Sequence, residues 1–232
     1  MMENITFPPR IIFDEREKAA ILGVVEKTMT GPEAIDMYGK GPQVTSYEKE
    51  FAEYLGVKYA AAVSSGTAAI HSAVGALRLE PGSEIITTPI TDPGTVAPIL
   101  MQNCIPIFVD VEYETLNLSA RSIEKNITDR TRAIIAVHLA GQPCDMEPIM
   151  EIARNHNLYV IEDCAQAHGA KYKGRYVGTI GDLGVFSLMA GKHMNSGGQG
   201  GMVITNHKEL YWNAKRFSDR GKPFNSEEKT NL

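Results

Sequence analysis

The sequence predicts a three-layer α/β/α fold built on a mostly parallel sheet. Two observations lead to this prediction. From Lys58 onward, short apolar runs alternate with stretches in which apolar residues recur at helical spacing. With 232 residues, 43% of them hydrophobic, the chain is also long enough to enclose a sizeable core. Strand–helix alternation of this kind is typical of parallel strands lying between helices that cover both faces of the sheet.

The segment before Lys58 is predicted to be helical with one interruption. Ile11–Lys27 and Val44–Leu55 both have the apolar spacing of amphipathic helices. Between them, Ala34–Lys40 is bordered by glycines and prolines, which predicts a loop or a short turn.

The remaining elements follow from where each apolar run starts and stops. The predicted strands are Tyr59–Val63, Glu84–Thr88, Ile105–Val111, Ala133–His138, Tyr159–Glu162, Gly184–Leu188 and Met202–Thr205. The predicted helices are Ala68–Leu79, Thr95–Asn103, Ala120–Asn126, Met146–Asn155 and Lys208–Arg220. Because parallel sheets bind ligands beyond the carboxyl ends of their strands, we expect functional residues directly after the apolar runs.

Composition and charge exclude several classes of protein. Lys and Arg number 23 against 28 Asp and Glu, a net charge of −5, which argues against a general nucleic-acid binder. No apolar run approaches the roughly 20 residues that span a bilayer, and the N-terminus lacks a signal-peptide pattern, so we expect a cytoplasmic protein without membrane partners. The cysteines Cys104, Cys144 and Cys164 have no zinc-ligand spacing and are expected to be buried thiols.

The first predicted strand ends in Ser64-Ser65-Gly66-Thr67, which opens a helix. Free backbone N–H groups at a helix start, with hydroxyls beside them, suit a phosphate group. Ser and Thr are also the ordinary caps of helices, so the motif alone leaves both interpretations open.

Asp163 follows a run of buried residues in Tyr159–Glu162. A carboxylate in this position is costly unless a cation or a donor meets it. Asp163 could orient a neighbouring helix, bind a metal or pair with a protonated ring nitrogen. Only His168 lies at a spacing that resembles a metal site, so a metal is the poorer interpretation and none is expected.

Lys192 follows the predicted strand Gly184–Leu188 and precedes the glycine-rich stretch 196–201. A lysine beside packed apolar groups can have a lowered pKa and act as a nucleophile towards aldehydes. Most lysines are instead solvated surface charges. The glycines lie between two late strands instead of at the first strand–helix turn, which makes a dinucleotide site a weak interpretation.

Taken in order, these three features meet the needs of pyridoxal 5′-phosphate (PLP), which requires a phosphate cradle, a partner for its ring nitrogen and an amine. Further motifs extend the pattern, among them Pro106-Ile107-Phe108-Val109-Asp110-Val111 and Val137-His138-Leu139-Ala140-Gly141. The densest is Val160-Ile161-Glu162-Asp163-Cys164-Ala165-Gln166-Ala167-His168-Gly169-Ala170. With these residues the chain resembles the DegT/DnrJ/EryC1/StrS family of PLP-dependent sugar aminotransferases, which have the aspartate-aminotransferase-like fold type I.

The resemblance implies a role for each matching residue. Lys192 would bond covalently to the cofactor and Asp163 would hold its ring nitrogen protonated, which makes these two the expected catalytic residues. The expected cofactor-binding residues are Gly66, Thr67, Asp163, Gln166, Ser187 and Lys192, with the phosphate on Gly66, Thr67 and Ser187. The roles of the family positions His138 and His168 stay open.

The implied function is transfer of an amino group from glutamate or glutamine to a keto sugar, usually nucleotide-linked, in amino-sugar, polysaccharide or secondary-metabolite biosynthesis. The implied partners are these small molecules and a second copy of the chain in a homodimer. Residues 1–45 would form an N-terminal arm and helix, and residues 46–232 the PLP-binding large domain, with the family's C-terminal small domain absent.

Two features depart from the family pattern. Where relatives often place an aromatic residue over the cofactor ring, this chain has Asp92, which is either a helix cap beside Pro93 or a functional group. The chain also ends near Leu232, where relatives continue. We therefore keep an alternative, a truncated member that binds PLP or dimerises without turnover.

Overall fold

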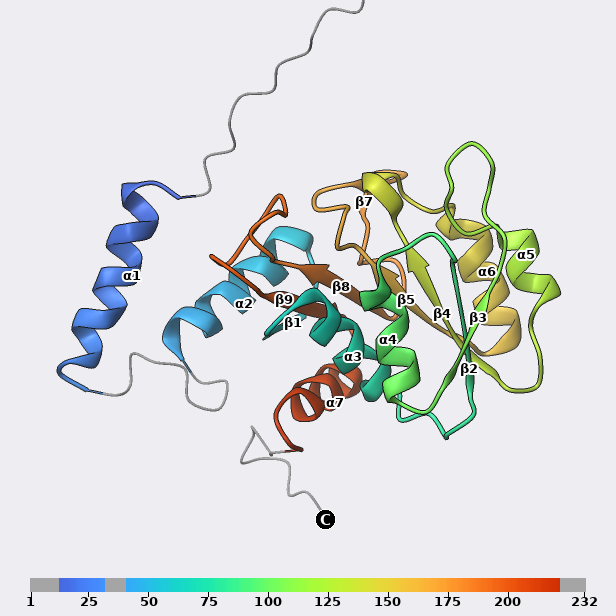
Figure 1. The fold of residues 1–232 in the computed structure, drawn as a ribbon, viewed down its shortest axis with the longest axis horizontal. Coiled ribbons are helices and arrows are strands. Elements are labelled where there is room, and N and C mark those ends of the chain that lie inside the picture. Colours follow the sequence, from blue (N-terminus) through green and yellow to red (C-terminus); the bar gives the residue numbers. More distant parts are fainter. Residues whose placement is uncertain (1–12, 32–40, 222–232) are drawn as a thin grey trace, which may run out of the picture.

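The computed structural model describes residues 13–31 and 41–221, and these fold around a seven-stranded sheet (Figure 1). The strands lie in the order β1-β9-β8-β5-β4-β2-β3. Their bounds are Tyr59–Val63 (β1), Glu84–Thr87 (β2), Ile105–Phe108 (β3), Thr131–Val137 (β4), Tyr159–Asp163 (β5), Leu183–Ser187 (β8) and Gly201–Thr205 (β9). Among these strands only β9 runs against its neighbours, which confirms the predicted mostly parallel sheet.

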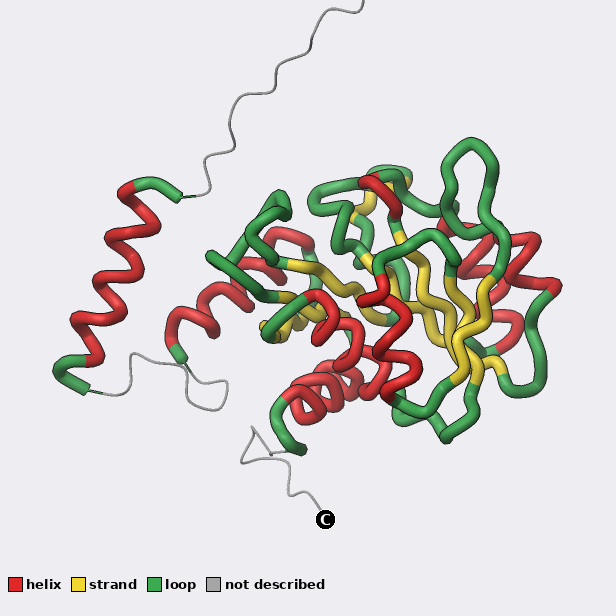
Figure 2. The backbone as a smooth tube through the Cα atoms, viewed as in Figure 1, coloured by secondary structure: helices red, strands yellow, loops and turns green. Residues whose placement is uncertain are grey.

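Helices cover both faces of the sheet, so the predicted three layers are present (Figure 2). One face packs against α3 (Gly66–Ala76), α4 (Pro93–Met101) and α7 (Lys208–Ser218). The opposite face packs against α2 (Pro42–Leu55), α5 (Ala120–Lys125) and α6 (Met146–His156). The N-terminal helix α1 (Glu15–Thr28) stands apart from these layers and has no buried residue.

The end of β5 places neighbouring residues in different surroundings. Ile161 belongs to the core under α3, α4 and α7, whereas Val160 belongs to the core under α5 and α6. Because side chains alternate along a strand, Glu162 and Asp163 also face opposite sides of the sheet. Only Asp163 therefore faces the layer in which α3 and α4 begin.

Several element boundaries differ from the prediction for local reasons. Asp14 caps α1 and forms a reciprocal capping box with Glu17, so the helix begins at Glu15, while the predicted start at Ile11 lies outside the described residues. β3 ends at Phe108 instead of Val111. The hairpin of β6 (Lys171–Tyr172) and β7 (Arg175–Tyr176) was not predicted, because two-residue strands show no periodicity.

Two further predictions concern the ends of the chain. The predicted loop at 34–40 lies outside the described residues. The division between residues 45 and 46 falls in the first turn of α2 and stays a prediction. Within residues 13–31 and 41–221, no helix combines the length and apolarity needed to cross a membrane.

Candidate functional site

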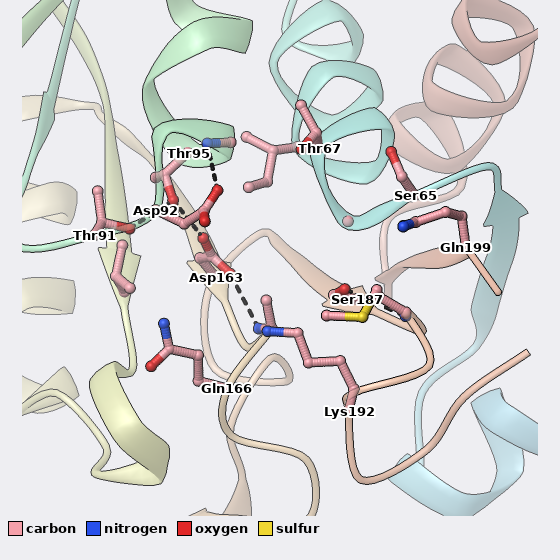
Figure 3. Close-up of a pocket in the computed structure, with 16 residues that line it drawn as sticks. Ser65, Thr67, Thr91, Asp92, Thr95, Asp163, Gln166, Ser187, Lys192 and Gln199 are labelled. Carbon is pink, nitrogen blue, oxygen red and sulfur yellow. Dashed lines mark hydrogen bonds between the residues drawn. The ribbon is translucent and has the colours of Figure 1, made fainter. Parts of the chain in front are cut away.

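A cavity of about 320 Å³ opens at the carboxyl ends of the parallel strands β1, β5 and β8 (Figure 3). The helices α3 and α4 begin at its wall, and helix N-termini carry partial positive charge. The structure brings every predicted site residue to this cavity, although their sequence positions span more than half of the chain. These residues are Gly66, Thr67, Asp163, Gln166, Ser187 and Lys192.

The start of α3 lies unusually close to the sheet. Ser65 caps the helix by accepting a hydrogen bond from the Ala68 backbone N–H at 3.0 Å. A Cβ on Gly66 would lie only 2.7 Å from Cβ of Ser187, the last residue of β8. The N–H groups of Gly66 and Thr67 have no acceptor inside the helix, as at any helix start. The close approach thus places free backbone donors and the Ser187 hydroxyl beside each other, which suits an anion such as a phosphate.

A second glycine supports the same arrangement. A Cβ on Gly201, at the start of β9, would lie 2.2 Å from the Ser65 carbonyl oxygen. Any side chain at Gly201 would therefore push the α3 start out of place. This explains part of the glycine-rich stretch without a dinucleotide loop.

Asp163 ends β5 and is only 4% exposed at the floor of the cavity. Oδ2 accepts a hydrogen bond from Thr95 Oγ1 at 2.8 Å, and Oδ1 accepts one from the Ala165 backbone N–H at 3.0 Å. Burial raises the pKa of Asp163 above its ordinary value, and these two donors and the charge of Lys192 act in the lowering direction. Asp163 is thus a buried carboxyl group that keeps accepting capacity on its cavity side.

Lys192 reaches the cavity from the loop after β8, and Figure 3 shows its side chain extending toward Asp163. The turn that carries it is fixed at two points. The Lys192 backbone N–H donates to the Met189 carbonyl at 2.8 Å, and the Met194 N–H donates to His168 Nδ1 at 3.1 Å. His168, whose role the sequence left open, therefore supports the loop that presents Lys192.

Gln166 lies on the wall next to Asp163. Its Oε1 accepts a hydrogen bond from the Ala140 backbone N–H at 2.8 Å, which fixes the amide at the cavity. On the opposite wall, Thr67 Oγ1 would lie 2.6 Å from a Cβ on Gly94, so Gly94 makes room for that hydroxyl. Both contacts join residues that are distant in the sequence.

Asp92 turns out to be the N-cap of α4, because its Oδ1 accepts a hydrogen bond from the Gly94 N–H at 2.8 Å. It also lines the cavity, so the cap and a functional position coincide. Sequence reasoning missed other lining residues, notably Thr91, Thr95 and Gln199. No local pattern marked the two threonines, because Thr91 precedes the N-cap Asp92 and only Thr95 lies in α4.

A buried group of His138, Glu162 and Cys164 has metal-ligand residue types within 4.8 Å of one another. His138 Nδ1 accepts a hydrogen bond from the Cys144 N–H, so Nε2 carries the hydrogen that it donates to Glu162 at 3.1 Å. Neither ring nitrogen then has a lone pair for a metal. Burial raises the pKa of Cys144 to about 12, and all three cysteines are buried thiols, as predicted.

Comparisons with known proteins give this geometry a context. A model of the DegT/DnrJ/EryC1/StrS aminotransferase family matches residues 19–231. GDP-perosamine synthase from Escherichia coli O157:H7 is 47% identical over 182 residues, covering 78% of this chain and 50% of that protein. The chain spans about half the length of the curated relatives it matches.

Solved structures show the same likeness. The aminotransferase from Psychrobacter cryohalolentis superimposes with a TM-score of 0.88 at 42% identity, over 94% of this chain and 54% of that one. NtdA from Bacillus subtilis, solved with bound cofactor PMP, gives a TM-score of 0.77 at 32% identity, over 89% of this chain and 46% of that one. The fold is therefore that of fold type I PLP-dependent aminotransferases, as predicted.

Proposed function

The chain belongs to the DegT/DnrJ/EryC1/StrS aminotransferase family, and from this premise we propose that it forms the cofactor site of a PLP-dependent sugar aminotransferase. The observation that carries the proposal is the convergence of six predicted residues on one cavity. The non-catalytic alternative has no observation in its favour.

The residues of the cavity fit PLP. The start of α3 offers free N–H groups beside Ser187, and the glycine positions 66 and 201 leave no space there for a side chain. We assign the phosphate to Gly66, Thr67 and Ser187, since backbone donors at a helix start favour an anion. When bound, PLP supplies a conjugated ring that takes up the electron pair of the bond broken at the substrate carbon.

We assign Asp163 as the partner of the cofactor's ring nitrogen. A carboxylate that faces the cavity stabilises a positive charge placed against it, and a buried site strengthens that interaction. Its two fixed donors occupy one lone pair on each oxygen and leave accepting capacity for a ring N–H. Gln166 lies on the adjoining wall, where we place the phenolic side of the ring.

Lys192 has two roles in this proposal. Its Nζ would hold the cofactor at the aldehyde carbon in the resting state and would yield that position to the arriving substrate amine. The freed amine then holds and moves a proton at the substrate carbon, for which its position on a short, anchored turn is suited.

The proposed amino donor is glutamate or glutamine and the acceptor a keto sugar linked to a nucleotide. Support comes from the relatives, which include GDP-perosamine synthase and a protein of spore coat polysaccharide biosynthesis. We further propose a homodimer in the cytoplasm. Exposed lining residues such as Asp92 and Gln199 leave room for contacts from a second chain.

The test is covalent trapping of the cofactor. The purified chain is incubated with PLP, reduced with borohydride and mapped by mass spectrometry. We expect one modified lysine, Lys192, and no stable adduct in Lys192→Ala. The matched control is Lys49→Ala, an exposed lysine of α2 outside the cavity, which should retain the Lys192 adduct. Equal trapping in Lys192→Ala and the unchanged chain, or none in either, contradicts the proposal.

A further inference from the structure

Two threonine hydroxyls form a hydrogen-bonded row that ends at the Asp163 carboxylate. Thr91 Oγ1 and Thr95 Oγ1 lie 2.7 Å apart, and Thr95 Oγ1 lies 2.8 Å from Asp163 Oδ2. Thr95 is only 1% exposed and Asp163 4%, so the inner bond of the row is screened from bulk water. Thr91 directly precedes Asp92, the N-cap of α4, Thr95 lies in the first turn of α4, and Asp163 ends β5 (Figure 3).

The direction of the hydrogens in this row follows from the charge of Asp163. An ionised carboxylate only accepts, so the single hydrogen of the Thr95 hydroxyl must point to Asp163. Thr95 Oγ1 then accepts from Thr91, which leaves both hydroxyl dipoles aligned toward the carboxylate. If Asp163 took up a proton on Oδ2 and donated it to Thr95, both hydroxyls would reverse. The row therefore favours the ionised carboxylate over the neutral acid.

The other charged and titratable groups that the structure describes near Asp163 do not donate a hydrogen bond to its carboxylate. Lys192 extends toward it from the loop after β8, and its charge acts on Asp163. The charge of a protonated His138 would act in the same direction, but the His138 ring, which follows β4, bonds to Glu162. Its Nδ1 accepts a backbone hydrogen bond from Cys144 and its Nε2 is bonded to Glu162. Glu162 points to the other face of the sheet. Besides the Ala165 backbone, Thr95 is thus the only hydrogen-bond donor to Asp163 among residues 13–31 and 41–221.

We propose that Thr95 is a positioning residue whose hydroxyl, oriented by Thr91, keeps the Asp163 carboxylate ionised and turned toward the ring nitrogen of the cofactor. This inference rests on the proposed function, since it presumes PLP in the cavity. Thr95 acts through Asp163 and is not assigned a contact with substrate.

The first arm of the test needs no cofactor. Carbon-13 NMR follows the titration of the Asp163 carboxyl carbon in the purified chain. Hydrogen bonds to charged groups correspond to roughly a tenfold or larger change in an equilibrium. We therefore expect Thr95→Val to raise the titration midpoint of Asp163 by about one pH unit or more, and Thr95→Ser to restore it. Thr91→Val, which removes only the outer hydroxyl, should give a smaller rise and is the second variant if Thr95→Val does not fold.

The matched control is Thr87→Val. Thr87 is also a fully buried threonine, but its hydroxyl donates to the Ile135 carbonyl instead of a carboxylate. It should leave the Asp163 midpoint unchanged. No rise in Thr95→Val, or an equal rise in Thr87→Val, overturns the proposal.

The second arm uses PLP labelled with nitrogen-15 in the ring, bound to the same variants. The ring nitrogen signal should be that of a protonated ring in the unchanged chain and in Thr95→Ser. In Thr95→Val the carboxylate becomes more basic, so the signal should move toward that of a neutral ring. An unchanged signal in Thr95→Val overturns the positioning role. Failure of the unchanged chain to bind PLP defeats the proposed function instead, and the cofactor-free titration still reports whether Thr95 governs Asp163.

Discussion

Glu162 and Asp163 are consecutive carboxyl groups, both buried at 0% and 4% exposure, with opposite kinds of surroundings. Glu162 accepts four hydrogen bonds, from His138 Nε2 and from the backbone N–H groups of Gly178, Ile180 and Gly181. Asp163 accepts two and faces a cavity. A carboxylate whose oxygens are all engaged fixes structure, whereas one with free accepting capacity beside a cavity is available to a ligand.

The same contrast separates two histidines. Both ring nitrogens of His138 take part in hydrogen bonds. His168 uses only Nδ1, and its buried Nε2 has no hydrogen-bond partner within the described parts of the chain. The fully paired residues belong to the framework around Glu162, and the half-paired one lies under the loop of Lys192. For the two consecutive carboxyl groups, complete hydrogen bonding thus distinguishes the framework residue from the candidate functional one better than burial does.

The largest effect on stability is expected from substituting Glu162. In Glu162→Gln one oxygen becomes an NH₂ group that faces two donors, which are then left unsatisfied. At about 1–3 kcal/mol for each unsatisfied group, we expect a loss of roughly 3 kcal/mol or more in the free energy of unfolding. Denaturant titration measures it. A midpoint equal to that of the unchanged chain would show that the four bonds do not hold the framework.

The matched substitution Asp163→Asn should cost no more than about 1 kcal/mol near neutral pH. The amide can donate to Thr95 Oγ1 and accept from the Ala165 N–H, so both existing contacts survive. A cost as large as that of Glu162→Gln would remove the distinction between the two carboxyl groups.

Asp163→Asn should also alter the pH dependence of stability. The folded-state pKa of Asp163 is raised by burial, so the folded chain binds more protons than the unfolded chain above the ordinary value of 3.8. The free energy of unfolding therefore falls as pH rises from about 3.8 toward the raised folded-state pKa. Thermal unfolding of the cofactor-free chain across acidic pH should show this loss, and Asp163→Asn should lack it.

A smaller effect of opposite sign is expected for His168. Burial, with the positive charges of His193 and Lys192, lowers the pKa of His168 to about 4 from an ordinary 6.5. The unfolded chain then binds more protons, so stability is lost as pH falls from about 6.5 toward 4. In His168→Asn, which keeps an acceptor for the Met194 N–H, this loss should be reduced. An unchanged acid profile would mean that His168 does not titrate in that range.

Much of the fold could be predicted because its signals are local. Apolar runs and helical periodicity indicated each strand of the large sheet, and Asp92 and Pro93 marked a helix start. The reversed direction of β9 and the short hairpin at 171–176 could not be predicted. Strand direction depends on which strands pair, and no single segment encodes its partner.

For the site, the sequence by itself determined which residue types follow the strands: the Ser-Gly-Thr turn, Asp163, Gln166 and Lys192. It also determined that Glu162 and Asp163 face opposite sides, since side chains alternate along a strand. Only the tertiary structure decided which of the two is satisfied. Three of the four donors of Glu162 come from the loop at 178–181, and the side-chain donor of Asp163 is Thr95, 68 residues away. Hydrogen bonding depends on distances between atoms, and for residues this far apart in sequence only the packed fold sets those distances.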